Sequence, residues 1–126
     1  MVHEINESEL ESLTKSKKIV IVDFSAVWCG PCKSIARILD AEVEPKMADK
    51  PDVVIVKIDI DKNKNLAQGL QILSVPTIMI FFHGKRVVLQ GEKGQDDRIV
   101  GFHPKIGQIL VDLVDHLEKL PPPKES

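Results

Sequence analysis

Residues 19–33, which read IVIVDFSAVWCGPCK, predict a buried strand that leads directly into a helix. The first residues are β-branched and apolar on both alternations, which is typical of a strand covered by helices on both faces of a sheet. A helix is expected to begin near Pro31, because proline fits the first turn of a helix. Apolar residues then recur at helical spacing until Pro45, namely Ile35, Ile38, Leu39 and Val43.

The rest of the chain extends this pattern into a layered domain. DVVIVKIDI at residues 52–60 predicts a second strand, parallel to the first through a right-handed crossover. After a short helix near Leu66 to Leu70, TIMIFF and RVVLQ flank HGK and predict an antiparallel hairpin. Amphipathic helices are predicted at both ends, around Leu10 and from Ile106 to Leu117. The predicted fold class is α/β, a mixed central sheet of four or five strands with helices on both faces.

The composition indicates one soluble domain without a nucleic-acid or membrane partner. Of the 126 residues, 43% are hydrophobic and 29% charged, so we expect a single domain over 1–120 and a disordered tail over 121–126. The net charge of −2, without a basic stripe, gives no electrostatic attraction to nucleic acid or an anionic membrane. The sequence shows no secretory signal and no stretch of roughly 20 apolar residues, so the cytoplasm is the expected location.

Both cysteines of the chain lie at the predicted strand-to-helix junction. Unpaired backbone N–H groups and the positive end of the helix dipole favour thiolate over thiol there, so we predict Cys29 as the nucleophile. Cys32 lies one turn further into the helix and is predicted to stay protonated until it resolves a mixed disulfide on Cys29. Between them, Gly30 permits close approach of a partner backbone and Pro31 stiffens the loop.

Two charged residues interrupt the predicted strands near the cysteine pair. Asp23 lies six residues before Cys29, and Lys57 lies on the strand that the crossover should place alongside. Burial raises the pKa of a carboxyl group and a nearby lysine lowers it again, so Asp23 is expected to exchange protons near neutral pH. Asp23 is therefore a candidate general base for Cys32, acting through water. The competing interpretations are that Asp23 has only a structural role and that the Lys57 side chain extends to solvent.

Other interpretations of the cysteine region remain open from the residues alone. The two thiols could form half of a zinc site, but none of the four histidines has the spacing of a matching ligand pair, so no metal is predicted. Trp28 is either a large apolar plug or a platform beside the site, and its position next to Cys29 favours the platform.

With these motifs, the sequence resembles the thioredoxin family from about Ile5 to Glu118. VDFSAVWCGPCK resembles the family's active-site strand, turn and helix start, KIDID its next strand, and VPT at residues 75–77 its proline loop. The resemblance implies a thioredoxin fold in which Pro76 is preceded by a cis peptide bond and lies against the cysteine pair. The backbone of Val75 is then free to pair with an extended substrate, and Gly101 forms part of the flat surface around the site.

The resemblance also implies a function. Cys29 would attack a protein disulfide and Cys32 would release the reduced product, with Asp23 as the buried acid and Lys57 as its charged neighbour. The expected partners are disulfide-containing proteins and a thioredoxin-reductase-type electron donor. We expect no bound cofactor and a monomer. Relatives that oxidise or isomerise disulfides usually carry a histidine between the cysteines, and its absence here favours a reductant. A disulfide oxidant or isomerase, and a binding module that uses residues 75–77 without turnover, remain as alternatives.

One segment departs from the family pattern. The connection between Gly84 and Gly101 is longer than usual, and the surplus is GEKGQDD at residues 91–97. Its glycines and mixed charges predict an exposed loop. The loop is either a tolerated surface insertion, since long loops cost little, or a contact for particular partners through Glu92 to Asp97.

Overall fold

The computed structural model describes residues 2–91 and 94–124 and builds them around one mixed sheet. Strand β2 (Ile19–Ser25) lies at the centre, parallel to β3 (Val53–Asp59) and antiparallel to β4 (Thr77–Phe82). The edges carry short strands, namely β1 (His3–Glu4) beside β3, and β5 (Lys85–Arg86) and β8 (Arg98–Val100) beside β4. These six strands occupy five positions, because β5 and β8 share one edge of β4.

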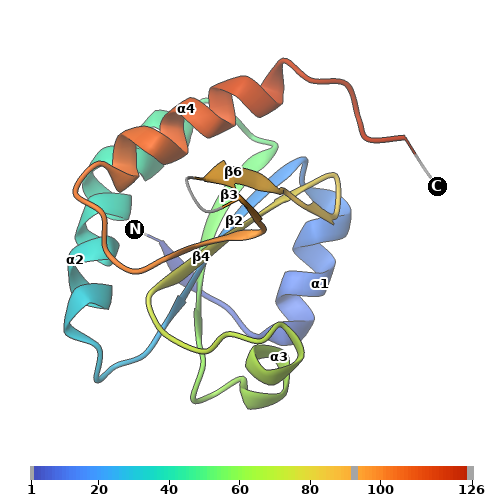
Figure 1. The fold of residues 1–126 in the computed structure, drawn as a ribbon. Coiled ribbons are helices and arrows are strands. Elements are labelled where there is room, and N and C mark those ends of the chain that lie inside the picture. Colours follow the sequence, from blue (N-terminus) through green and yellow to red (C-terminus); the bar gives the residue numbers. More distant parts are fainter. Residues whose placement is uncertain (1, 92–93, 125–126) are drawn as a thin grey trace.

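Two helices cover each face of the sheet (Figure 1). Helices α2 (Gly30–Ile38) and α4 (Ile106–Glu118) lie on one face, and α1 (Glu7–Ser16) and α3 (Lys64–Gly69) lie on the other. Alternate side chains of β2 point to opposite faces, so Ile19 and Ile21 pack beneath α2 and α4. Val20 and Val22 pack beneath α1 and α3. The predicted α/β class, with helices on both faces of a mixed sheet, is confirmed.

The helices begin close to their predicted positions. Asn6 caps α1 through a capping box with Glu9, as expected for an acidic first turn. Helix α2 begins at Gly30, so Pro31 lies in its first turn. Its regular α-helical part ends at Ile38, earlier than predicted, and continues as a π-helical turn (Leu39–Val43) and a 3₁₀ turn (Glu44–Met47). The apolar residues of these turns still pack into the core beside α4.

The predicted strand RVVLQ is wrong in part, because the chain leaves the sheet after Arg86. A continuous strand would place residues 88–90 along the first half of β4, and β8 occupies that edge instead. Strands β6 (Leu89–Gly91) and β7 (Gly94–Asp96) pair with each other as a separate two-stranded antiparallel sheet. Gly91 and residues 94–96 of the predicted loop are exposed as expected but belong to strands, Asp97 is half-buried, and Glu92 and Lys93 lie outside the described residues.

None of the helices in the described part of the chain has both the length and the apolar character needed to cross a bilayer. The division into a domain over 1–120 and a tail over 121–126 stays a prediction.

Candidate active site

Cys29 lies at the junction that the sequence predicted, between the end of β2 and the first turn of α2. It is the N-cap residue of α2, and its Sγ accepts a hydrogen bond of 3.2 Å from the backbone N–H of Cys32. The two cysteines are joined by a disulfide, with their Cα atoms 5.3 Å apart. When the pair is reduced, the same N–H group and the helix dipole favour negative charge on the Cys29 sulfur.

Burial alone does not distinguish the two cysteines, which are 4% and 3% exposed. Their surroundings differ instead. Cys29 faces the segment before β4, and its Sγ lies 3.7 Å from the carbonyl oxygen of Val75. Cys32 lines a pocket on the other side of the junction. The tertiary structure therefore places the Cys29 sulfur beside the Val75 backbone, and it places Cys32 at a pocket that polar side chains also line.

The proline loop lies against the cysteine pair, as the resemblance implied. The peptide bond between Val75 and Pro76 is cis. The Pro76 carbonyl accepts a 2.9 Å hydrogen bond from the backbone N–H of Gly101, directly after β8. Gly101 has a φ of +86°, a left-handed conformation that favours glycine. The structure thus brings residues 29–32, 75–76 and 101 together at one end of the sheet.

Trp28 lies on the surface beside Cys29, in the position expected of a platform. It is 67% exposed, so it is not a buried plug. Its indole N–H donates a 2.8 Å hydrogen bond to the Asp61 carboxylate. Val27 and Leu73 are also exposed, one next to Trp28 in sequence and the other two residues before Val75. These apolar side chains give the site a surface that can contact another protein.

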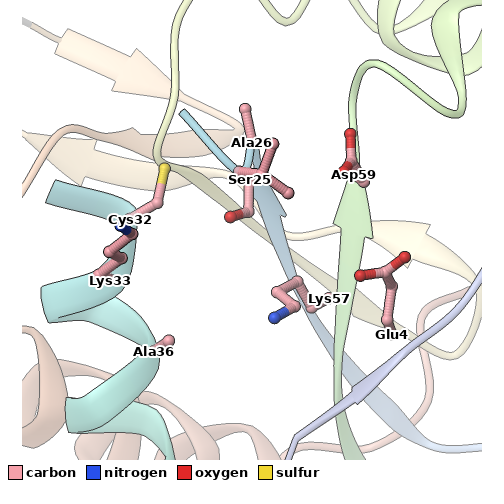
Figure 2. Close-up of a pocket in the computed structure, with 9 residues that line it drawn as sticks. Glu4, Ser25, Ala26, Cys32, Lys33, Ala36, Lys57 and Asp59 are labelled. Atoms are coloured by element: carbon pink, nitrogen blue, oxygen red, sulfur yellow. The ribbon is translucent and has the colours of Figure 1, made fainter. Parts of the chain in front are cut away.

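Behind Cys32, a pocket of about 270 Å³ opens between α2 and the ends of β2 and β3. Its lining is mostly polar at the sheet side, where Ser25, Lys57 and Asp59 contribute, and Ala36 borders it from α2. Figure 2 shows the Lys57 amine pointing from β3 toward α2. Since one water molecule occupies about 30 Å³ in the liquid, the pocket has room for several.

Asp23 lies beneath this pocket rather than in its lining. Register pairing places it beside Lys57 on β3, and it shares a face of β2 with Ser25. Its side chain is 1% exposed, and neither carboxyl oxygen has a hydrogen-bond partner among the described residues. Burial raises the pKa of Asp23 from 3.8 to about 7, and the positive charge of Lys57 opposes that rise. The predicted pairing of these strands is confirmed, and the pKa of Asp23 shifts in the predicted direction.

Three polar residues near the site were missed by the sequence reasoning. Ser25 and Asp59 line the pocket, and Asp61 holds the Trp28 indole. The sequence contained a usable pattern, because Ser25 and Asp59 are the last residues of parallel strands and Asp61 follows shortly after, so all three lie at one edge of the sheet. Asp59 also accepts a 2.8 Å hydrogen bond from the N–H of Asp61, which fixes the turn after β3.

Among the described residues, no group of three or more histidine, cysteine or acidic side chains is placed to hold a metal ion. The expectations of no metal and no bound cofactor stay predictions.

Comparisons with known proteins identify this arrangement. A family model described as Thioredoxin matches residues 1–103. The chain belongs to the thioredoxin family. A thioredoxin of Griffithsia pacifica is 39% identical over 114 residues, which cover 90% of this chain and 93% of the relative. A thioredoxin of Mycoplasmoides gallisepticum is 36% identical over 105 residues, covering 83% of this chain and 92% of the relative.

The predicted thioredoxin fold is confirmed by solved structures. A variant thioredoxin from Halobacterium salinarum superposes with a TM-score of 0.71 at 28% identity, covering 96% of this chain and 93% of that one. Family membership and the Cys29–Cys32 disulfide make this thioredoxin-family protein a thiol–disulfide oxidoreductase with protein-disulfide reductase activity. Its partners, in general terms, are disulfide-containing proteins and a reductase.

Proposed function

We propose that the protein is a cytoplasmic, monomeric electron carrier in which Cys29 attacks and Cys32 resolves. The observation that carries this assignment is the N-cap position of Cys29, whose sulfur accepts the Cys32 N–H and lies beside the Val75 carbonyl. Trp28, Gly30, Pro31, Val75, Pro76 and Gly101 would form the surface that receives a substrate.

In the first step, the Cys29 thiolate attacks one sulfur of a substrate disulfide. A Cys29–substrate bond forms, the substrate S–S bond breaks, and the second substrate sulfur leaves with the electron pair and takes up a proton. The backbone of Val75 holds the substrate in extended form beside Cys29, because this carbonyl lies within 3.7 Å of the attacking sulfur.

In the second step, Cys32 attacks the Cys29 sulfur and expels the reduced substrate. The proton of Cys32 passes to Asp23 through water in the pocket, which a carboxyl group with a pKa of about 7 can accept near neutral pH. Lys57 lowers the pKa of Asp23 and so keeps part of the population ionised. The pair ends as a disulfide, and a thioredoxin-reductase-type donor returns two electrons to it.

A trapping experiment tests the two cysteine roles. In Cys32→Ser, the first step proceeds but the mixed disulfide on Cys29 cannot be resolved, so disulfide-linked substrate should accumulate on a nonreducing gel. Cys29→Ser is the matched control and should capture nothing. Capture by Cys29→Ser and not by Cys32→Ser would reverse the assignment, and capture by neither would favour a binding module.

The reduction potential tests the direction of electron flow. In a graded thiol buffer followed by Trp28 fluorescence, we expect a potential below the cytosolic glutathione poise, where 30 mV corresponds to about 1.4 kcal/mol for two electrons. A markedly less negative value would indicate an oxidant or isomerase.

The cytoplasmic location and monomeric state have separate supports and tests. Both cysteines of the chain belong to the redox pair, which suits a compartment where thiols stay reduced. A monomer leaves the surface around Cys29 open to substrate and reductase in turn. Fractionation of cells that produce the full chain, and light scattering with an expected mass of 14.1 kDa, check these two proposals. A membrane or secreted fraction, or a doubled mass, would contradict them.

A further inference from the structure

The strand pair β6–β7 is followed by an ion-pair cluster at the edge of the main sheet. After β7, the chain returns to the sheet at Asp97 and enters β8, which pairs with β4. Asp97 lies between two arginines. Its Oδ1 accepts a 2.7 Å hydrogen bond from Arg98 Nε, and its Oδ2 accepts one of 3.1 Å from Arg86 on β5.

The Asp97–Arg98 pair is sheltered from solvent, in contrast to an ordinary surface ion pair. The side chains of Arg98 and Asp97 are only 15% and 20% exposed. The hydrogen bond from Arg98 is the main reason that the pKa of the Asp97 carboxyl lies below its usual value. The planar guanidinium is therefore held in one orientation, with its Nη1 group free to bind elsewhere.

That free group binds the segment that leads to the active site. Arg98 Nη1 donates a 2.9 Å hydrogen bond to the carbonyl oxygen of Gln71, which lies 27 positions earlier in the chain. Gln71 has a φ of +57°, a left-handed conformation that few residues other than glycine adopt. Such a conformation is unfavourable and persists only where neighbouring contacts hold it.

Residues 98–101, which comprise β8 and the glycine after it, therefore hold both ends of residues 71–76, the segment that carries Val75. Arg98 binds the Gln71 carbonyl at the start, and the Gly101 N–H binds the Pro76 carbonyl at the end. Between these anchors, the Leu73 side chain is almost fully exposed and the Val75 carbonyl lies beside Cys29. A shift at either end would move the backbone that meets a protein substrate.

We propose that Arg98, oriented by Asp97, is a positioning residue that holds residues 71–75 in the conformation that binds protein substrates. The inference rests on the proposed role of the Val75 backbone in substrate binding. It gives the strand pair β6–β7 a function, because the chain that leaves β7 places Asp97 and Arg98 beside the first half of β4. Arg98 touches neither cysteine, so it affects binding of an extended substrate and not the sulfur chemistry itself.

The test compares a protein disulfide with a small one in Arg98→Met, which keeps the apolar stem and removes the guanidinium. With insulin as the protein substrate, we expect KM to rise about tenfold with kcat little changed, since the loss of the Arg98 hydrogen bond frees residues 71–75 to leave the binding conformation. With a small aromatic disulfide, kcat/KM should stay within twofold, because such a substrate does not need the Val75 backbone.

Two further variants separate positioning from general stability. Arg98→Lys keeps the charge but cannot bind Asp97 and the Gln71 carbonyl in the same planar fork, so KM for insulin should rise by a smaller factor of about three. Lys50→Met is the matched control. It removes an ion pair with Glu118, whose side chains are 25% and 32% exposed, on the side of the fold away from the cysteines. The kinetics with either disulfide should be unchanged.

The outcomes also separate this inference from the proposed function. If the unmodified protein reduces both disulfides but Arg98→Met affects both equally, or neither, the positioning role is wrong and the reductase cycle stands. If the unmodified protein reduces neither disulfide, the proposed function fails first. An unchanged reduction potential in the Arg98 variants is required, because a shifted potential would mean that Arg98 acts on the cysteines.

Discussion

Two aspartates in this protein have opposite electrostatic environments. Asp23 lies in the central strand, almost fully buried, and its carboxyl oxygens have no hydrogen-bond partner among the described residues. Asp97 lies at the sheet edge and is bound by Arg98 and Arg86. Burial raises the pKa of Asp23 to about 7, and the hydrogen bond from Arg98 lowers the pKa of Asp97 below its usual value.

The difference shows how the same side chain can serve chemistry or structure. A buried carboxylate without partners destabilises the folded state, which favours the proposed role of Asp23 in proton transfer over a role in stability. A carboxylate bound by two guanidinium groups stabilises the loop around it, stays ionised near pH 7 and does not exchange a proton there. The pH dependence of stability should therefore have opposite signs at these two positions.

The largest expected effect is the stabilisation of the oxidised protein by Asp23→Asn at high pH. Because the folded-state pKa of Asp23 exceeds its unfolded value of 3.8, the folded protein binds the extra proton between these values and loses stability as pH rises toward 7. A shift from 3.8 to about 7 corresponds to about 4 kcal/mol at 1.4 kcal/mol per pKa unit. Urea unfolding at pH 8.5 should show this gain.

The same comparison at pH 3 provides the control, because Asp23 is protonated there in both folded and unfolded chains. The two proteins should then unfold at nearly the same urea concentration. A gain that does not vary with pH would mean that Asp23 is not ionised in the folded protein at pH 8.5.

A smaller effect is expected from Lys57→Met, which removes the positive charge that opposes the rise in the pKa of Asp23. Removing the lysine should raise the pKa of Asp23 above 7, so less carboxylate is present at neutral pH to accept the Cys32 proton. We expect release of reduced substrate to slow about fivefold at pH 7 and to recover near pH 9. Stopped-flow Trp28 fluorescence measures this step.

Lys62→Met is the control for this experiment, since it removes an exposed ion pair with Glu4 instead. Its pH profile should match that of the unmodified protein. If Lys57→Met shifts the profile toward lower pH, Lys57 does not act through the charge of Asp23.

The smallest effect is expected from Asp97→Asn, which should destabilise the protein by about 1 kcal/mol at pH 7. The folded-state pKa of Asp97 lies below its unfolded value of 3.8, so its stabilisation is complete above that pH and is lost as pH falls through the folded pKa. Thermal unfolding at pH 7 and pH 3 measures the difference. Glu11→Gln, in a well-exposed ion pair with Lys15, should change little at either pH. A loss at pH 3 as large as the loss at pH 7 would contradict the ionic interpretation.

Much of the site was predictable because its residues follow local patterns. The strand-to-helix junction places Cys29 at the N-cap, and the charged residues in apolar strands mark Asp23 and Lys57. The prediction of one continuous strand over residues 86–90 was wrong in part for a long-range reason, since β8 occupies the edge of β4 that this strand would have used. Strand propensity alone does not reveal competition for one edge.

The sequence by itself determined the two apolar faces of the strands, the helix that begins at the cysteine pair, and the family to which the chain belongs. These features depend on residue type and on spacing within a few positions. Only the tertiary structure decided which distant groups meet, such as Trp28 with Asp61, Cys29 with the Val75 carbonyl, and Arg98 with the Gln71 carbonyl. Those contacts join residues 27 to 46 positions apart, and they form because packing of the sheet and helices brings their backbone segments together.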